Sequence, residues 1–228
     1  MVDTLKDRCE MFVKNRDIMK NNFKWENSMM HPLCARIFTE KELEINAAKI
    51  KSCKEIDIEV TRELLKNSFV IENDDKLTIE HSTSSIIPFI KYYLEDVKVI
   101  TLVLTKQVKL EDVDTMVDAL YENVNINETL FIASVDFSHY LDLDQANKMD
   151  LISMDAIQNN DINKIMSFTN DNLDSPISIA AMLKMMDKAG VINKSVLNHS
   201  NSELILEKKI EETTSYITYL FIGQGDVR

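Results

Sequence analysis

Apolar residues gather in three short runs that predict buried strands, at residues 98–104, 129–135 and 215–222. The first two runs, KVITLVL and TLFIASV, are continuously apolar, as in strands that are covered on both faces of a sheet. The third run, SYITYLFI, alternates more and indicates a strand nearer to an edge. Between the first two, LEDVDTMVDALYENV (110–124) has helical periodicity. This order predicts a right-handed β-α-β unit and therefore an α/β fold with a mainly parallel sheet flanked by helices.

Helical spacing of apolar residues recurs in most of the remaining chain. The positions predicted to face the core are Val60, Leu64 and Leu65 in residues 57–67, Val113, Met116, Val117 and Leu120 in 110–124, and Ala146, Met149, Ile152 and Ala156 in 142–161. A further helix is predicted from Ser175, as the N-cap, to Gly190, as the C-cap, with Pro176 at its first position.

The first 53 residues have a different pattern, with polar-rich helical segments and no strand signal. We expect one domain over residues 1–228, with a core at 54–228 and a helical segment of different character at 1–53. That segment is either a helical cap on the sheet or a region loosely tied to the core. In either case, residues 1–53 are a candidate to cover an unpaired strand at the edge of the predicted sheet.

Composition and charge exclude several classes of protein. The net charge of -12 disfavours nucleic acid as a partner, and a chain with 3 glycines has no glycine-rich phosphate loop. No apolar run reaches the roughly 20 residues that span a bilayer, so we expect no membrane segment. Cys9, Cys34 and Cys53 are odd in number and lack any C-x-x-C spacing, and the N-terminus does not resemble a signal peptide. We therefore expect a cytoplasmic protein with reduced thiols.

Asp136 and His139 follow the predicted strand at 129–135 directly. In open α/β sheets, ligands bind beyond the carboxyl ends of the strands, which is where this pair is expected. The alternative is a structural turn, in which Asp136 accepts hydrogen bonds from nearby backbone N–H groups and His139 is half-exposed. Position alone leaves both interpretations open.

Glu80 and His81 form a second acidic and imidazole pair, placed just before a predicted helix that contains Pro88 in its first turn. A carboxylate beside an imidazole can orient it as a ligand or a base. The alternative is a capped helix start with a surface histidine. The other histidines are weaker candidates: His199 could reach the same end of the sheet, and His31 lies three residues from Cys34.

The stretches EHSTSSIIPFIKYY (80–93) and SVDFSHY (134–140) resemble, in order and spacing, the paired motifs of the Memo-like proteins, also called AmmeMemoRadiSam system protein B. The later stretches DSPISIAAML, LNHSNS and TTSYITYLFIG resemble the closing helix, strand and final strand of that family. The similarity covers roughly residues 56 to 223.

This resemblance implies a fold related to the class III extradiol dioxygenases, which hold a non-haem iron through two histidines and a carboxylate. In Memo-like proteins the equivalent pocket contains histidines, an aspartate and a cysteine, a metal has been proposed there, and the reaction is undefined. The D-F-S-H motif carries over to Asp136 and His139, and the E-H-S motif to Glu80 and His81. The resemblance thus implies a His/Asp pocket with these four as catalytic candidates. Its metal-ligand candidates are His81, Asp136 and His139, and iron or copper is the implied metal.

Three expected pocket residues are missing, however. The family's P-H and G-P-N-H motifs do not occur, and Asn172 stands where the family has a cysteine. A catalytic iron or copper site requires at least three well-placed protein ligands and one open coordination position. The chain is therefore either a Memo-like protein with a working site or a non-catalytic interaction or scaffold protein that keeps the fold.

As an enzyme, the chain would use His139 as base or ligand, Asp136 to orient it, and His81 as a second ligand or acid. A metal-dependent hydrolase outside the family is a third, weaker alternative. The family name implies an AMMECR1-like protein and a radical SAM enzyme as partners.

Overall fold

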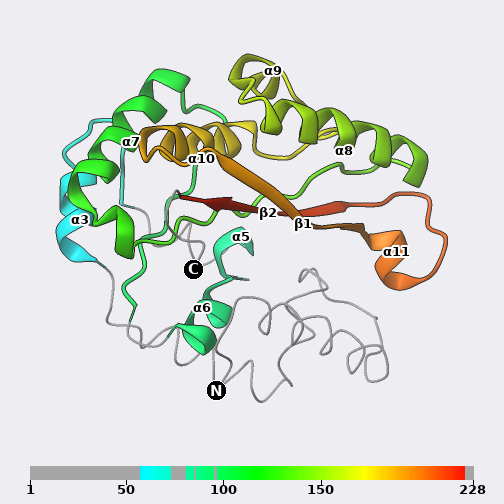
Figure 1. Cartoon of the computed structure of the whole chain (residues 1–228), viewed down its shortest axis with the longest axis horizontal. Coiled ribbons are helices and arrows are strands. Elements are labelled where there is room, and N and C mark those ends of the chain that lie inside the picture. The colour runs from blue at the N-terminus through cyan, green and yellow to red at the C-terminus, as the bar shows by residue number, and fades with distance from the viewer. Residues whose placement is uncertain (1–56, 73–80, 85, 95–96, 224–228) are drawn as a thin grey trace. The chain divides into compact units, whose positions relative to one another are not determined.

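The computed structural model describes residues 57–72, 81–84, 86–94 and 97–223 (Figure 1). These residues belong to two compact units, the first containing the described part of 81–101 and the second containing 57–72 and 102–223. The helices predicted for residues 1–53 lie outside the described residues. The prediction of one domain over the whole chain stays a prediction.

The first unit contains two short helices, α5 (His81–Ser84) and α6 (Ile87–Tyr93). Pro88 lies in the first turn of α6, as its sequence position predicted, because the N–H groups of that turn have no partner within the helix. His81 is itself the first residue of α5, whereas the sequence placed it just before a helix. Glu80 lies outside the described residues.

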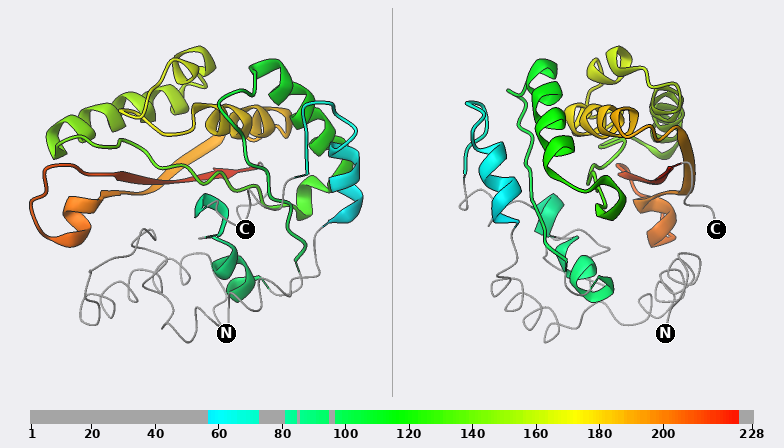
Figure 2. Two further views of the ribbon diagram at one scale, coloured as in Figure 1. Left: turned by 180° about the vertical axis from the view of Figure 1, so that it is seen from behind. Right: turned by 60° about the vertical axis from the view of Figure 1, so that its left-hand side comes forward.

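The second unit is built from helices around one pair of strands. Its elements are α3 (Ile58–Leu64), α7 (Leu110–Asn123), the 3₁₀ helix η2 (Ile126–Glu128), α8 (Leu143–Gln158), α9 (Ile162–Met166), α10 (Pro176–Lys188), β1 (Asn193–Asn201), α11 (Ser202–Leu206) and β2 (Ser215–Ile222). Helices α8, α9 and α10 lie on the same side of the strand pair (Figures 1 and 2). Their buried residues form a core that also receives three side chains of β2, Ile217, Tyr219 and Phe221.

The strand at 215–222 is confirmed, but the mainly parallel sheet is not. Among the described residues the one sheet has two strands, and β1 pairs with β2 in antiparallel register from Asn193↔Ile222 to Asn201↔Ser215. The runs at 98–104 and 129–135 belong to no described ladder, and 98–104 has a single bridge residue at Val99. Leu130 and Ile132 are 67 % and 48 % exposed, so this run is not covered on both faces. The prediction of a buried strand at 129–135, which relied on the apolar character of this run, is therefore wrong.

The helix predictions hold better. Val113, Met116, Val117 and Leu120 are the buried face of α7, as predicted. Helix α10 starts at Pro176 after Ser175, although the Ser175 side chain makes no capping hydrogen bond. At its other end Gly190 adopts a left-handed φ of 70° directly after the C-cap residue Ala189.

The predicted core stripe of α8 is partly wrong. Ala146 and Ala156 are fully buried, but Ile152 is 39 % exposed. Two polar residues, Asp150 and Ser153, occupy the buried face in its place. Buried polar groups are stable only when they are hydrogen-bonded, and both side chains have such partners.

Candidate functional site at the D-F-S-H segment

The D-F-S-H segment, residues 136–139, is held on one side by the start of β2. The Phe137 N–H donates to the Ser215 carbonyl over 3.0 Å, and the Ser215 N–H donates to the Ser138 carbonyl over 2.9 Å. Phe137 is 2 % exposed and belongs to the core. Because Phe137 and Ser138 are anchored, the polar residues on either side of them, Asp136 and His139, have defined positions.

The loop before α10 holds the other side of the segment. The Asp174 N–H donates to the Asp136 carbonyl over 3.0 Å, and the His139 N–H donates to the Asn170 carbonyl over 2.9 Å. An isolated antiparallel bridge also joins Phe137 to Leu173. Residues 136–139 therefore lie between the start of β2 and the loop before α10, both of which come later in the sequence.

The imidazole of His139 is oriented by two polar neighbours. Its Nδ1 atom lies 3.1 Å from Oγ1 of Thr214, and its Nε2 atom lies 3.9 Å from Oδ2 of Asp136. The side chains of His139 and Asp136 are 14 % and 27 % exposed. The second distance is too long for a hydrogen bond, but it suits an ion pair when the ring is protonated. The structure thus brings together the two residues that the D-F-S-H motif predicted.

Two further ionisable residues belong to this site, and the sequence analysis missed both. Burial, followed by the negative charge of Asp136, raises the pKa of Asp174, although part of Asp174 is accessible to solvent. Burial and the same charge raise the pKa of Tyr216 well above its ordinary value. Tyr216, like any tyrosine, is protonated at neutral pH and can donate a hydrogen bond, and the shift keeps it protonated further into the alkaline range. We call Asp136, His139, Asp174, Thr214 and Tyr216 the D-F-S-H site.

Tyr140, the residue after the motif, has a left-handed backbone with φ of 58°. This conformation is uncommon for a residue with a bulky side chain and is concentrated at functional sites. The Tyr140 ring stacks on His139 with 5.4 Å between ring centroids. The turn thus places an aromatic ring, 68 % exposed, directly beside the imidazole.

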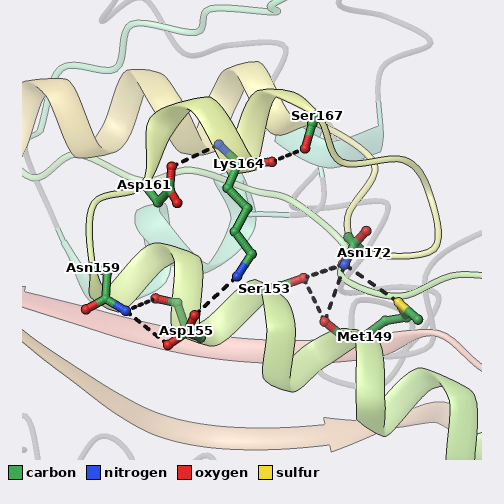
Figure 3. Close-up of polar contacts among 8 residues, drawn as sticks. All are labelled: Met149, Ser153, Asp155, Asn159, Asp161, Lys164, Ser167 and Asn172. Atoms are coloured by element: carbon green, nitrogen blue, oxygen red, sulfur yellow. Dashed lines mark hydrogen bonds and ion pairs between the residues drawn. The ribbon is translucent and has the colours of Figure 1, made fainter.

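Asn172, which the sequence analysis aligned with a cysteine of the Memo-like proteins, faces helix α8. Its Nδ2 atom lies 3.3 Å from Oγ of Ser153 and 3.5 Å from the Met149 carbonyl oxygen (Figure 3). Ser153 in turn donates to the Met149 carbonyl over 3.0 Å. The Asn172 amide is therefore part of the packing between its loop and α8, while Asp174 carries the polar group of this loop that interacts with Asp136 and His139.

The remaining predicted site residues are not placed by the structure. Glu80 and His31 lie outside the described residues, and for His81 only the backbone is described. Within the described ranges, no group of three or more His, Cys, Asp or Glu side chains is arranged to hold a metal ion. Asp136 and His139 thus supply two donors of a possible site, which is fewer than the three that a catalytic metal requires.

The missed residues lie in stretches that the sequence comparison had singled out for other reasons. Asp174 precedes Ser175 and Pro176 at the start of α10, and Thr214 and Tyr216 lie in the T-T-S-Y motif that leads into β2. Their positions within those motifs could have identified them as candidate site residues. Their approach to the D-F-S-H segment could not have been identified in this way, because it depends on the pairing of Phe137 and Ser138 with Ser215 and on the contact of Asp136 with Asp174.

Comparison with known proteins identifies a family that matches most of the chain. The family model of the Memo-like proteins matches residues 53–220. A MEMO1 family protein of Saccharolobus islandicus is 32 % identical over 108 residues, which are 45 % of this chain and 38 % of that protein. A MEMO1 family protein of Thermoplasma acidophilum is 29 % identical over 141 residues, 60 % of this chain and 51 % of the relative.

A third relative, a MEMO1 family protein of Methanococcus maripaludis, is 28 % identical over 178 residues, 73 % of this chain and 61 % of the relative. This chain therefore spans less than two thirds of the length of these three relatives. The described part of the chain combines helices with a small antiparallel sheet. The chain belongs to the Memo-like family.

In the part of the chain that the structure describes, no helix has the length and apolar character needed to cross a membrane.

Proposed function

We propose that this Memo-like protein binds a transition-metal ion, iron or copper, at the D-F-S-H site through Asp136 and His139. The E-H-S motif alone makes His81 a candidate ligand. The observation that carries the proposal is the orientation of His139, whose Nδ1 atom lies by Thr214 and whose Nε2 atom lies on the side of Asp136. A neutral imidazole that donates its Nδ1 proton to a neighbour presents the Nε2 lone pair to a metal.

The described residues fit such an ion in part. One imidazole and one carboxylate are suitable donors for iron or copper, and Thr214 is the kind of neighbour that fixes the ring of a histidine ligand. When bound, the ion would supply Lewis-acid or redox chemistry. Tyr216, which stays protonated, would donate a hydrogen bond to a bound anion, and Asp174 would hold or release a proton beside it.

Metal content tests the proposal. The full chain is purified without an affinity tag under anaerobic conditions, and its iron, copper and zinc are measured by elemental analysis. We expect one ion per chain in the wild type and its loss in His139→Ala and Asp136→Asn. His81→Ala tests the third ligand separately.

Two variants serve as controls for these measurements. Asp155→Asn removes an exposed carboxylate that pairs with Lys164, and His31→Ala removes an imidazole outside the matched family region. Both should keep the metal. A wild-type protein that binds no metal even after reconstitution would contradict the proposal, as would full metal content in His139→Ala.

The second candidate function is an interaction or scaffold protein that keeps the Memo-like fold without a working site. The specific observation in its favour is Asn172, an amide in place of the family's cysteine that packs on α8. Under this alternative, His139→Ala and Asp136→Asn leave partner binding unchanged. An AMMECR1-like protein and a radical SAM enzyme are the partners to test first, by co-purification from cells that express all three.

A further inference from the structure

Helix α8 contains a buried carboxylate, Asp150, that is not one of the residues of the D-F-S-H site. Asp150 has no exposed surface, although it lies on a helix with a long solvent-facing side. Placing a carboxylate in the interior is costly unless both of its oxygens receive partners. The two partners of Asp150 come from different elements of the second unit.

Each carboxylate oxygen of Asp150 has one close neighbour. Ser138 donates its hydroxyl proton to Oδ1 over 2.6 Å, and the Nε2 atom of His199 lies 2.7 Å from Oδ2. Ser138 is fully buried, whereas the His199 side chain is 28 % exposed. Asp150 therefore links the D-F-S-H segment to an imidazole on β1 that reaches the surface.

We infer that Asp150 is a positioning residue of the D-F-S-H site, which fixes Asp136 and His139 through its hydrogen bond with Ser138 and connects them to His199. Ser138 is the neighbour of His139 in the chain and is two residues from Asp136. Its hydroxyl has a second, longer contact of 3.3 Å with the Ala146 carbonyl, also on α8. The charged partner makes the Asp150 contact the stronger of the two.

A role limited to filling the core does not explain this arrangement. Ser153 lies on the same buried face of α8, and it meets its hydrogen-bonding needs with the backbone of Met149 and with Asn172. Asp150 instead contacts one residue inside the D-F-S-H motif and one on the sheet. The inference rests on the proposed function only for its metal readout, because the positioning of the segment can be measured without a metal.

Hydrogen–deuterium exchange of the full chain tests the inference. Ser138→Ala removes the link and leaves the pair of Asp150 and His199 in place, while Asp150→Asn removes the charge. We expect exchange in residues 136–141 to become roughly tenfold faster in both variants, since a hydrogen bond to a charged group is lost. Exchange in α10 should stay unchanged, which separates local positioning from a general loss of stability. Ser153→Ala, a buried serine on the same helix, is the matched control and should not affect residues 136–141.

Binding of Co²⁺, followed by its visible absorption under anaerobic conditions, gives the second readout. Loss of the positioning contact should weaken Co²⁺ binding by about 10- to 100-fold in Ser138→Ala, as for other groups that orient metal ligands. If wild type binds no Co²⁺ but residues 136–141 still exchange faster in Ser138→Ala, the proposed function fails and this inference stands. If Ser138→Ala matches wild type in both exchange and Co²⁺ affinity, the inference is wrong, whatever His139→Ala shows.

Discussion

The backbone N–H of Asp174 donates to the carbonyl oxygen of Asp136 over 3.0 Å. This contact brings the loop before α10 against the D-F-S-H segment and sets two acidic side chains in the same region. Burial and the charge of Asp136 then raise the pKa of Asp174 above its usual value of 3.8. The folded protein therefore holds this proton at pH values where the unfolded chain has lost it.

Asp174→Asn should accordingly change how stability depends on pH. Stability falls as pH rises through a window in which the folded state binds more protons, which for Asp174 begins near 3.8 and extends to its raised pKa. The variant lacks this loss, so its stability relative to wild type should be greater at pH 7 than at pH 4. Urea denaturation at both pH values measures the difference. Asp171→Asn, in the same loop, is the control, and an identical pH profile for Asp174→Asn and wild type would contradict the prediction.

Removal of the Asp150 carboxylate should destabilise the fold strongly. Asp150→Ala leaves His199 and the buried Ser138 hydroxyl without their partner. The loss of a hydrogen bond between the buried Ser138 hydroxyl and a charged group should by itself cost about 1.5–3 kcal/mol. Urea unfolding at 25 °C measures the change in the free energy of unfolding. Asp155→Ala, on the exposed side of α8 beside Lys164, should cost less than about 1 kcal/mol. Similar losses in the two variants would count against the buried pair.

The Tyr219 hydroxyl is the clearest unfavourable group in the described core. It is buried, and no described residue accepts or donates a hydrogen bond to it, while its ring lies 6.5 Å from Phe137 and 6.2 Å from Phe221. Tyr219→Phe keeps the ring contacts and removes the polar atom. We expect a gain in stability of about 1 kcal/mol, since the cost of an unpaired buried hydroxyl disappears.

Alkaline pH provides a second check on the Tyr219 variant. Burial raises the pKa of Tyr219 to about 12, so between pH 10 and 12 the unfolded chain loses a proton that the folded protein keeps. Stability of the wild type therefore falls as pH rises through this window, and Tyr219→Phe should remove part of the fall. The gain at neutral pH is compared with that of Tyr121→Phe, whose ring faces Lys188 and should keep that contact.

Local pattern predicted those parts of the fold that depend on local interactions. The alternation of Ile217, Tyr219 and Phe221 gave β2 with its observed bounds, and the apolar spacing around Val113 gave the buried face of α7. Both depend on which residues of one element are apolar. The family motif likewise brought out Asp136 and His139, because they are close neighbours in the chain.

Long-range polar contacts were beyond the sequence analysis. On α8, hydrophobic spacing placed Ile152 in the core, but the buried positions belong to Asp150 and Ser153. Their partners, Ser138, His199 and Asn172, lie on other elements, so no periodicity of α8 can reveal them. The run at 129–135 failed as a predicted strand for a related reason: apolar composition does not specify which neighbour, if any, pairs with it.

Cysteine substitution can show which way the loop before α10 presents its side chains. Asn172 is buried against Met149 and Ser153 (Figure 3). Asp174, two residues further along the chain, is exposed. In a background in which Cys9, Cys34 and Cys53 are serine, we expect the thiol of Asn172→Cys to react slowly with an aromatic disulfide reagent and that of Asp174→Cys to react fast. Asn172→Cys should also lose about 1–2 kcal/mol, because Ser153 loses a partner. Rapid labelling of Asn172→Cys in a folded protein would show that this position faces solvent. The packing of the Asn172 amide on α8 would then be wrong.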